Sequence, residues 1–218
     1  MKWRLSPKRR FRKKASTRSI LTTSIDLLRH GVTENSQRYC GSTDYPLTAL
    51  GWTQMWHAVN SQSTQWQHIV TSPLTRCADF AHALGQRYSI PVSQDDHIRE
   101  IHFGDWEDRS SAELMHTDAG ALYRFWQNPL DYPPPNGEHL PYFEARVLSA
   151  WEDIQQQFFG KKVLLITHGG VIRMIICHIL QHPLERALDI DVRHASIRQV
   201  RIDHAKTYRV TLDLDSSV

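Results

Sequence analysis

The sequence predicts an α/β protein, a three-layer α/β/α sandwich built on a mostly parallel sheet. Short continuous apolar runs at residues 25–28 and 163–166 are typical of strands that helices cover on both faces. Between these runs, segments with helical spacing of apolar residues alternate with further short strands. A chain of 218 residues suits one domain of this kind, and no linker rich in Gly, Ser or Pro divides it.

The first half of the chain supplies three strands and two helices. A turn-rich loop through residues 41–46 follows the strand at 25–28, and the pattern then predicts a helix over 48–60 and a strand at 68–71. Ser72 and Pro73 suit the N-cap and first position of a helix that runs to about residue 88. A short strand is expected at 91–93.

The second half opens with a polar, proline-rich stretch at 105–136, which we expect to hold at most two short helices and to form an insertion over the site. A long amphipathic helix should begin near Pro141, the strand at 163–166 follows, and residues 171–180 read as a core helix. Residues 197–203 and 208–214 alternate as edge strands do. The amphipathic helix is recognised by apolar residues at steps of three and four: Phe143, Val147, Trp151, Ile154 and Phe158.

The positive charge of the chain is confined to its N-terminal end. Residues 1–19 hold nine Lys and Arg and no acid, whereas the rest carries 17 basic and 23 acidic residues, a net charge of −6. We therefore predict a solvated, disordered extension at 1–23, able to bind nucleic acid only non-specifically, and a single domain at 24–218.

The composition also bears on the compartment in which the chain works. No apolar run approaches the roughly 18 residues of a membrane span, and no apolar stretch follows the basic end as a secretory signal requires. The three cysteines, Cys40, Cys77 and Cys177, are odd in number and widely spaced, which fits neither a disulfide framework nor a zinc site. We expect a cytoplasmic protein that does not bind membranes.

Three short motifs predict an active site. Arg29-His30-Gly31 and His168-Gly169-Gly170 each follow a predicted strand, and Arg76 lies in the first turn of the helix after a third strand. Because the carboxyl ends of parallel strands meet at one edge of the sheet, these residues should lie together. Arginine binds phosphate oxygens in a bidentate way, and a neutral imidazole is a nucleophile near neutral pH. The motifs predict phosphoryl transfer through a histidine.

Each residue has a simpler interpretation when it is taken alone. A single histidine after a strand is more often a packing residue than a functional one. A single arginine forms a surface ion pair about as often as it has a functional role. Gly31 favours a functional role for His30, because glycine lets the backbone approach an anion closely. For His30 to attack through one ring nitrogen, an acceptor must hold the other as an N–H donor.

The expected reaction also needs a proton donor for the leaving oxygen. Glu100 is the candidate, since the like charge of a bound phosphate dianion favours the protonated carboxyl, and Glu107 is the rival. Asp95, Asp96, His97 and His102 lack the spacing of a metal site, and no phosphate-binding Walker loop is present. We expect catalysis without a metal or another cofactor.

Together these motifs resemble the histidine phosphatase, or phosphoglycerate mutase-like, superfamily from residue 24 to the end. The resemblance implies that His30 is phosphorylated, that Arg29, Arg76 and His168 hold the phosphoryl group, and that Glu100 donates the proton. Gly41, Pro46, Leu47, Thr48 and Gly51 match the family's Gly-x-x-x-x-Pro-Leu-Thr-x-x-Gly loop. The family's asparagine lies six residues after the nucleophile, where this chain has Ser36; Asn35 is the candidate for that contact.

The partner that the resemblance implies is a small-molecule phosphate ester. The runs at 103–107 and 135–138 most closely resemble phosphatases of α-ribazole 5′-phosphate, a precursor in cobalamin synthesis. Trp126 and Tyr132, in a proline-rich segment, could form an aromatic wall for its flat base, or could simply pack the insertion onto the domain. Alternatives are a sugar-phosphate or broad-specificity phosphatase similar to fructose-2,6-bisphosphatase, a phosphotransferase of the phosphoglycerate mutase type, and a non-catalytic binding module.

Overall fold

The computed structural model describes residues 22–62, 65–204 and 209–213. The basic extension predicted at 1–23 therefore lies outside the described residues up to residue 21. In the described part of the chain, no helix is both long enough and apolar enough to cross a bilayer.

A six-stranded sheet forms the middle layer of the described structure, in the order β3-β2-β4-β1-β5-β6. The first four strands are parallel, whereas β5 runs antiparallel to both β1 and β6. The sheet is thus mostly parallel, with two closing strands at one edge, as the sequence predicted. Its strands are β1 (Thr22–Arg29), β2 (His68–Thr71), β3 (Val92–Gln94), β4 (Lys162–Thr167), β5 (Ile197–Asp203) and β6 (Arg209–Asp213).

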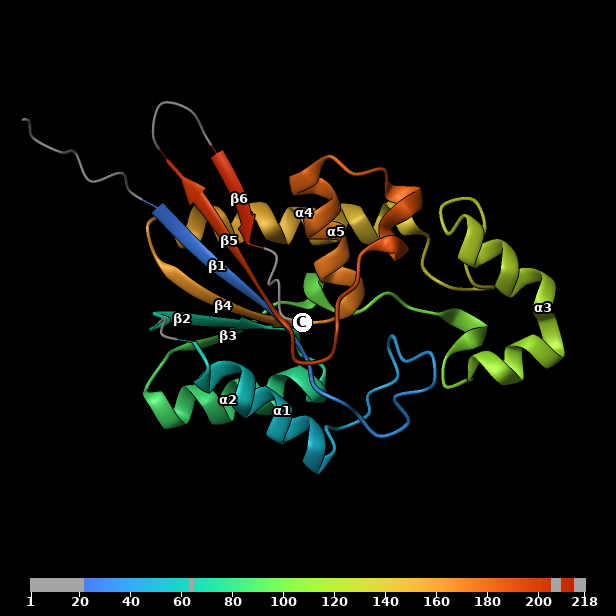
Figure 1. Cartoon of the computed structure of the whole chain (residues 1–218), viewed down its shortest axis with the longest axis horizontal. Helices are drawn as coiled ribbons and strands as arrows, with labels where there is room; N and C mark the ends of the chain where they lie inside the picture. Colours follow the sequence, from blue (N-terminus) through green and yellow to red (C-terminus); the bar gives the residue numbers. More distant parts are fainter. Residues whose placement is uncertain (1–21, 63–64, 205–208, 214–218) are drawn as a thin grey trace, which may run out of the picture.

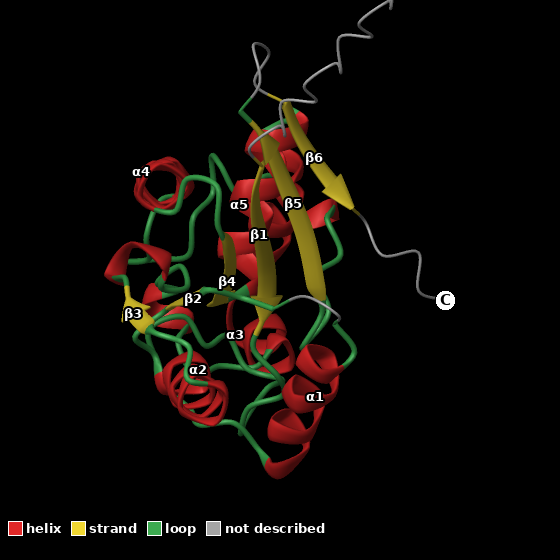
Figure 2. Ribbon diagram, turned by 90° about the vertical axis from the view of Figure 1, so that its left-hand side faces the viewer, coloured by secondary structure: helices red, strands yellow, loops and turns green. Residues whose placement is uncertain are grey.

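Helices cover both faces of this sheet (Figures 1 and 2). One face packs against α1 (Ala49–Asn60) and α2 (Thr75–Tyr88), and the other against α4 (Leu140–Gln157) and α5 (Gly169–Leu180). Neighbouring residues of one strand serve the two layers, because successive side chains of a strand point to opposite faces. Leu27 joins the core under α4 and α5, and Leu28 joins the core under α1 and α2.

The carboxyl ends of the parallel strands bring the predicted motifs together. In the register of the sheet Arg29 pairs with Thr167 and Thr71 with Ile166, so β1, β2 and β4 end side by side. His30, Ser72 and His168 are the residues that follow these three strands. These residues therefore lie at one edge of the sheet, as the sequence predicted.

Helix α2 begins differently from the prediction. Ser72 and Pro73 precede the helix, which starts at Thr75 after Leu74, and Leu74 supplies no side-chain cap. Instead Asp44, from the loop before α1, accepts hydrogen bonds from the backbone N–H and the hydroxyl of Thr75 at 2.9 Å. A carboxylate from another segment therefore caps the helix, and the Ser72 hydroxyl is left to bond a histidine of the site.

The segment at 105–136 holds two short α-helical pieces, as expected. They make up α3 (Ser111–Gln127), in which Asp118 is non-helical and separates the two pieces, and α3 extends away from the sheet (Figure 1). A capping box between Ser110 and Glu113 stabilises its start. Its buried face packs on Trp106 of a short 3-10 helix, Gly104–Trp106, rather than on the sheet.

Candidate active site

A crevice of about 190 Å³ lies at the carboxyl edge of the sheet. His30 lines it, and one acid, Glu100, faces four arginines across it. Two of these arginines, Arg29 and Arg76, were predicted, and the other two are Arg38 and Arg173. The surplus of positive charge suits a phosphate dianion, because guanidinium groups bind phosphate oxygens through charge-assisted hydrogen bonds.

His30 is held as a neutral base. Only 7% of the residue is exposed, and burial together with the charges of Arg76 and Arg29 lowers its pKa well below the usual range. The Nδ1 atom lies 2.8 Å from the carbonyl oxygen of Gly31, which can only accept, so Nδ1 carries the proton. The lone pair is therefore on Nε2, which meets the requirement that an acceptor fix the other ring nitrogen.

Arg29 is held by the loop that precedes β5. Its Nη1 donates to the carbonyl of Val192 at 2.6 Å, and its Nη2 donates to Nε2 of His194 at 3.0 Å. Within the described residues, Nε of Arg29 is buried without a hydrogen-bond partner. With five N–H groups and two bonds, Arg29 retains donors for an anion in the crevice.

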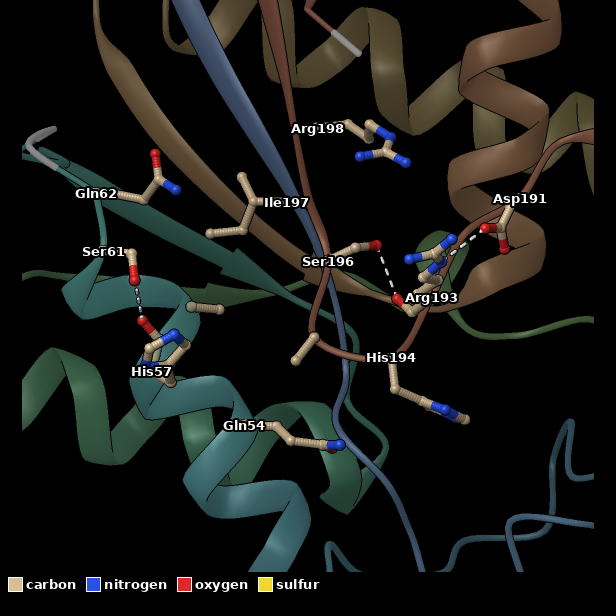
Figure 3. A pocket seen from close by; sticks show the side chains of 12 residues that line it. Gln54, His57, Ser61, Gln62, Asp191, Arg193, His194, Ser196, Ile197 and Arg198 are labelled. Carbon is tan, nitrogen blue, oxygen red and sulfur yellow. Dashed lines mark hydrogen bonds and ion pairs between the residues drawn. The ribbon is translucent and has the colours of Figure 1, made fainter. Parts of the chain in front are cut away.

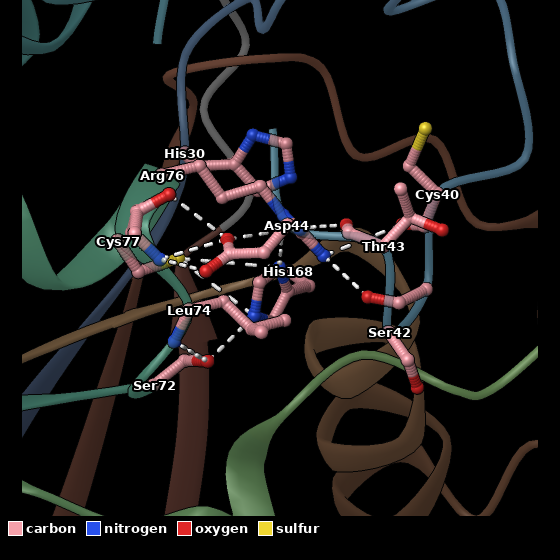
Figure 4. Close-up of polar contacts among 12 residues, drawn as sticks. His30, Cys40, Ser42, Thr43, Asp44, Ser72, Leu74, Arg76, Cys77 and His168 are labelled. Atoms are coloured by element: carbon pink, nitrogen blue, oxygen red, sulfur yellow. Dashed lines mark hydrogen bonds and ion pairs between the residues drawn. The ribbon is translucent and has the colours of Figure 1, made fainter. Parts of the chain in front are cut away.

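Arg76 is 1% exposed and is held by the loop at 40–43 (Figure 4). Its guanidinium donates to the carbonyls of Cys40, Gly41 and Thr43 at 2.7–3.3 Å, and its Nε donates to Nδ1 of His168 at 3.2 Å. These four bonds leave about one N–H of the five free. Arg76 therefore contributes mainly its positive charge to the crevice. Gly41 contributes to the site by accepting a hydrogen bond from Arg76 at its carbonyl oxygen.

His168 lies beside His30, with 5.3 Å between the ring centroids, but it is not among the residues that line the crevice. Its Nδ1 accepts from Arg76, so its Nε2 carries the proton and donates to the Ser72 hydroxyl at 2.7 Å. Burial and the charge of Arg76 lower its pKa well below the usual range. In this arrangement His168 holds Arg76 in place, and its ring lies next to that of His30.

Glu100 lies at the crevice and accepts a hydrogen bond from the backbone N–H of Gly170 at 3.1 Å. Its rival Glu107 lies elsewhere and accepts from the backbone of Gly41, Ser42 and Thr43 at 2.9–3.2 Å. Burial raises the pKa of Glu107, but these hydrogen bonds, with others from the Thr43 hydroxyl and the loop at 103, outweigh burial and lower it. A carboxylate held in its ionised form is a poor proton donor, so Glu100 is the better candidate acid.

Gly31 has a packing role in the structure. A β-carbon on Gly31 would lie 2.4 Å from the carbonyl oxygen of Gly51, so this glycine permits close packing of the loop after β1 on α1. A different glycine serves the site. A β-carbon on Gly170 would lie 2.2 Å from Oε1 of Glu100, so any larger residue here would force the carboxylate of Glu100 to move from its present position.

The structure does not place three of the predicted substrate contacts at the crevice. Asn35 is exposed and absent from the lining, where its neighbour Ser36 is found, as the family spacing indicates. Trp126 is 41% exposed and donates to the Tyr39 hydroxyl, and Tyr132 is 46% exposed. These aromatic residues belong to the α3 insertion, which extends away from the crevice instead of covering it.

Sequence reasoning missed His194 and Arg173. His194 lines the crevice, its ring centroid lies 5.6 Å from that of His30, and burial and Arg29 lower its pKa to about 4, so it is neutral at pH 7. A second hollow, of about 680 Å³ between α1 and the loop before β5, shares this histidine (Figure 3). Arg173 could have been found, since it is the one charged residue in the apolar run 171–177 and follows Gly169 by one helical turn.

Among the described residues, no three His, Cys, Asp or Glu side chains gather as metal ligands do. Glu100 is the one acidic side chain in the lining of the crevice, which four arginines share, and this set fits an anionic substrate.

Comparison with known proteins supplies the family. The family model of the histidine phosphatase superfamily, branch 1, matches residues 25–214. The structure of YhfR of Bacillus stearothermophilus is 31% identical, with a TM-score of 0.80 and coverage of 89% of this chain and 98% of that one. A mycobacterial glucosyl-3-phosphoglycerate phosphatase is 27% identical at a TM-score of 0.79, covering 90% and 100%.

The structure of an α-ribazole phosphatase from Shigella flexneri is 26% identical, with a TM-score of 0.76, and the match covers 89% of this chain and 96% of that one. The Shigella protein and the mycobacterial enzyme are both named phosphatases, which are enzymes that hydrolyse phosphate esters. The phosphoglycerate mutase-like fold expected from the motifs is confirmed. Since the family model spans nearly the whole described domain, the chain belongs to the histidine phosphatase superfamily and is a phosphatase.

Proposed function

We propose that this phosphatase hydrolyses phosphate monoesters through a phosphohistidine formed on His30. The observation that carries the proposal is one small crevice lined by a neutral histidine and four arginines. The arginines would bind the phosphate dianion, and the imidazole Nε2 would face its phosphorus. Covalent catalysis divides a slow displacement by water into two faster steps.

In the first step, the lone pair of His30 Nε2 forms a bond to phosphorus while the bond from phosphorus to the ester oxygen breaks. The carboxylic acid of Glu100 gives its proton to that oxygen, which leaves as an alcohol. In the second step, water attacks phosphorus, Glu100 takes a proton from the water, and the bond from phosphorus to Nε2 breaks. Inorganic phosphate leaves, and both His30 and Glu100 return to their starting forms.

The surrounding residues would prepare these steps. Gly31 fixes the tautomer of His30 through its carbonyl, and Arg29 presents free N–H groups to the phosphoryl oxygens. His168 would position Arg76 through its Nδ1 and, as the family resemblance implies, would hold the phosphoryl group beside His30. Positive charge fixed beforehand stabilises the transferring phosphoryl group without reorganisation.

For the substrate we infer α-ribazole 5′-phosphate. The supports are the runs at 103–107 and 135–138 and the likeness to the Shigella α-ribazole phosphatase. A second candidate is a sugar-phosphate ester, because the mycobacterial glucosyl-3-phosphoglycerate phosphatase is equally similar. The test compares kcat/KM, without added metal, for α-ribazole 5′-phosphate, fructose 2,6-bisphosphate and 3-phosphoglycerate.

We expect α-ribazole 5′-phosphate to be the best of the three by at least tenfold. Preference for either of the others would overturn the substrate assignment and leave the phosphatase chemistry standing. Conversion of 3-phosphoglycerate to its 2-phospho isomer, with little free phosphate, would replace hydrolysis by phosphotransfer. Glu100→Gln should slow alkyl phosphates much more than activated aryl phosphates, whose leaving oxygen needs little protonation.

A further inference from the structure

An apolar slot opens beside the phosphate crevice, on the side of the proposed acid. The slot has a volume of about 90 Å³. It shares three lining residues with the crevice, namely Glu100, Phe103 and Arg173. Any group attached to the ester oxygen that Glu100 protonates would therefore pass Glu100 and reach the slot.

The interior of the slot is built from hydrophobic side chains of four separate segments. Phe125 ends the buried face of α3, Phe143 comes from α4 and Met174 from α5, and all three are at most 6% exposed. Ala187 and Leu188, in the 3-10 helix Leu184–Asp189, close the remaining side, and Leu188 is 42% exposed at the rim. Pro129 and Pro134, from the chain after α3, line the same slot.

The polar groups at the slot already have partners. Glu138 accepts two hydrogen bonds from Arg146, at 2.7 and 2.9 Å. Arg173 donates through Nε to the carbonyl of Ile190 at 3.0 Å, and Glu100 accepts from Gly170. Glu100 and Arg173 also line the crevice, so the rest of the slot wall is apolar apart from Glu138. A hydroxyl or a second phosphate placed deep in the slot, away from Glu100 and Arg173, would lose water without gaining an equivalent partner, and such a loss disfavours binding.

We propose that this slot binds the apolar part of the leaving alcohol, so that the substrate is the phosphate ester of an alcohol bearing an aromatic ring or a branched alkyl group. The inference rests on the proposed function, because it uses the position of Glu100 at the leaving oxygen. A cavity of about 150 Å³ takes a benzene molecule, so a slot of about 90 Å³ takes the edge of a ring or a short branched chain. Phe103, Phe125 and Phe143 thus take the place that Trp126 and Tyr132 were expected to hold.

The slot selects among the candidate substrates. In α-ribazole 5′-phosphate a ribose joins the phosphate to a methylated aromatic base, so the far end of the leaving alcohol is apolar, whereas fructose 2,6-bisphosphate and 3-phosphoglycerate have no apolar part to place in the slot. Each methylene moved from water into the slot should raise kcat/KM about fourfold. The physical argument therefore favours the first of these esters independently of any likeness in sequence.

The test is kcat/KM for four esters of primary alcohols: propyl, 3-methylbutyl and 2-phenylethyl phosphate, and ribose 5-phosphate. The leaving alkoxides of the alkyl esters are similar in basicity, so differences report the binding of the carbon chain. We expect 2-phenylethyl phosphate to exceed propyl phosphate by at least tenfold, with 3-methylbutyl phosphate between them and ribose 5-phosphate no better than propyl phosphate.

Two substitutions locate the effect. Ala187→Leu fills the slot, and Leu188→Gln makes its rim polar on a surface where folding is not at risk. Each should reduce the ratio of 2-phenylethyl to propyl phosphate at least fivefold. The matched control is Leu180→Gln, on an exposed leucine at the end of α5 that does not line the slot, which should leave the ratio unchanged. Thermal unfolding of each variant identifies one that has lost its fold.

The outcomes distinguish a failure of the slot proposal from a failure of the proposed mechanism. Hydrolysis of all four esters at similar kcat/KM, or an unchanged ratio in folded Leu188→Gln, would overturn the slot and leave the proposed phosphatase mechanism intact. A preference for ribose 5-phosphate would also overturn the slot proposal. Failure to hydrolyse any ester, with no phosphohistidine formed, would overturn both proposals together.

Discussion

The substitution Glu107→Gln tests how the site holds its buried arginine. Both oxygens of this carboxylate accept at least two backbone N–H groups, Oε1 from Ser42 and Phe103 and Oε2 from Gly41 and Thr43. The loop that these bonds fix is the one whose carbonyls hold Arg76. Whichever oxygen becomes an amide NH₂, two backbone donors lose their acceptor and meet another donor.

The expected magnitude follows from those two bonds. Hydrogen bonds to a charged group contribute about 1.5–3 kcal/mol each, and water replaces part of this at the exposed Ser42. We expect the free energy of unfolding to fall by about 2–3 kcal/mol. Because Arg76 loses part of its support, the inhibition constant of inorganic phosphate should rise about tenfold.

The effect should also depend on pH. The hydrogen bonds hold the pKa of Glu107 below its unfolded value of 4.5, so their stabilisation is fully present above that pH and is lost as the pH falls through the folded pKa. The difference in stability between wild type and Glu107→Gln should therefore be full at pH 7 and shrink below about pH 4.5.

Urea unfolding and competitive inhibition by phosphate are the two assays. Asp105→Asn is the matched control, since Asp105 lies in the same segment but is exposed and bonds only the Asn136 side chain. It should change the unfolding free energy by less than about 0.5 kcal/mol and leave phosphate inhibition unaltered. Equal effects of the two substitutions, or wild-type phosphate affinity in Glu107→Gln, would refute the reasoning.

Three further predictions concern other contacts of the fold and the site. Gly170→Ala should displace Glu100, whose Oε1 would lie 2.2 Å from the new β-carbon, and lower kcat for alkyl phosphates about 100-fold while sparing aryl phosphates; equal losses would count against it. His194→Phe removes an acceptor of Arg29 and should raise the phosphate inhibition constant about tenfold, whereas His194→Gln, which keeps an acceptor, should restore binding. Asp26→Ala leaves two donors without the carboxyl that they share and should lower the free energy of unfolding by about 2–4 kcal/mol in urea; a loss below 0.5 kcal/mol would contradict this.

The fold was predictable because its signals are local. The apolar runs at 25–28 and 163–166 lie inside β1 and β4, and α1 (Ala49–Asn60) lies within the helix predicted over 48–60. The start of α2 was not predictable in detail, because its cap is Asp44, which lies 31 residues before Thr75. The two short helical pieces of the insertion were predictable, but the packing of their apolar face on Trp106 instead of on the sheet was not.

The same difference between local signals and tertiary contacts applies to the site. The residues in motifs, Arg29, His30 and Arg76, were placed correctly at the crevice because the end of a strand or the start of a helix fixes their position. His194 carries no local signal, since only a tertiary contact with Arg29 brings it to the site. Aromatic composition alone did not say which way a side chain faces, which is why the sequence left open whether Trp126 lines the crevice or packs the insertion, where it donates to Tyr39.

The most direct test of the proposed mechanism is the chemical state of His30 during turnover. The enzyme is quenched in alkali within milliseconds of mixing with labelled substrate, digested, and sequenced by mass spectrometry. The account predicts an alkali-stable, acid-labile phosphate on His30, formed at up to one equivalent per chain and missing from His30→Ala. Label on a serine, an aspartate or another histidine, or full turnover by His30→Ala, would contradict it.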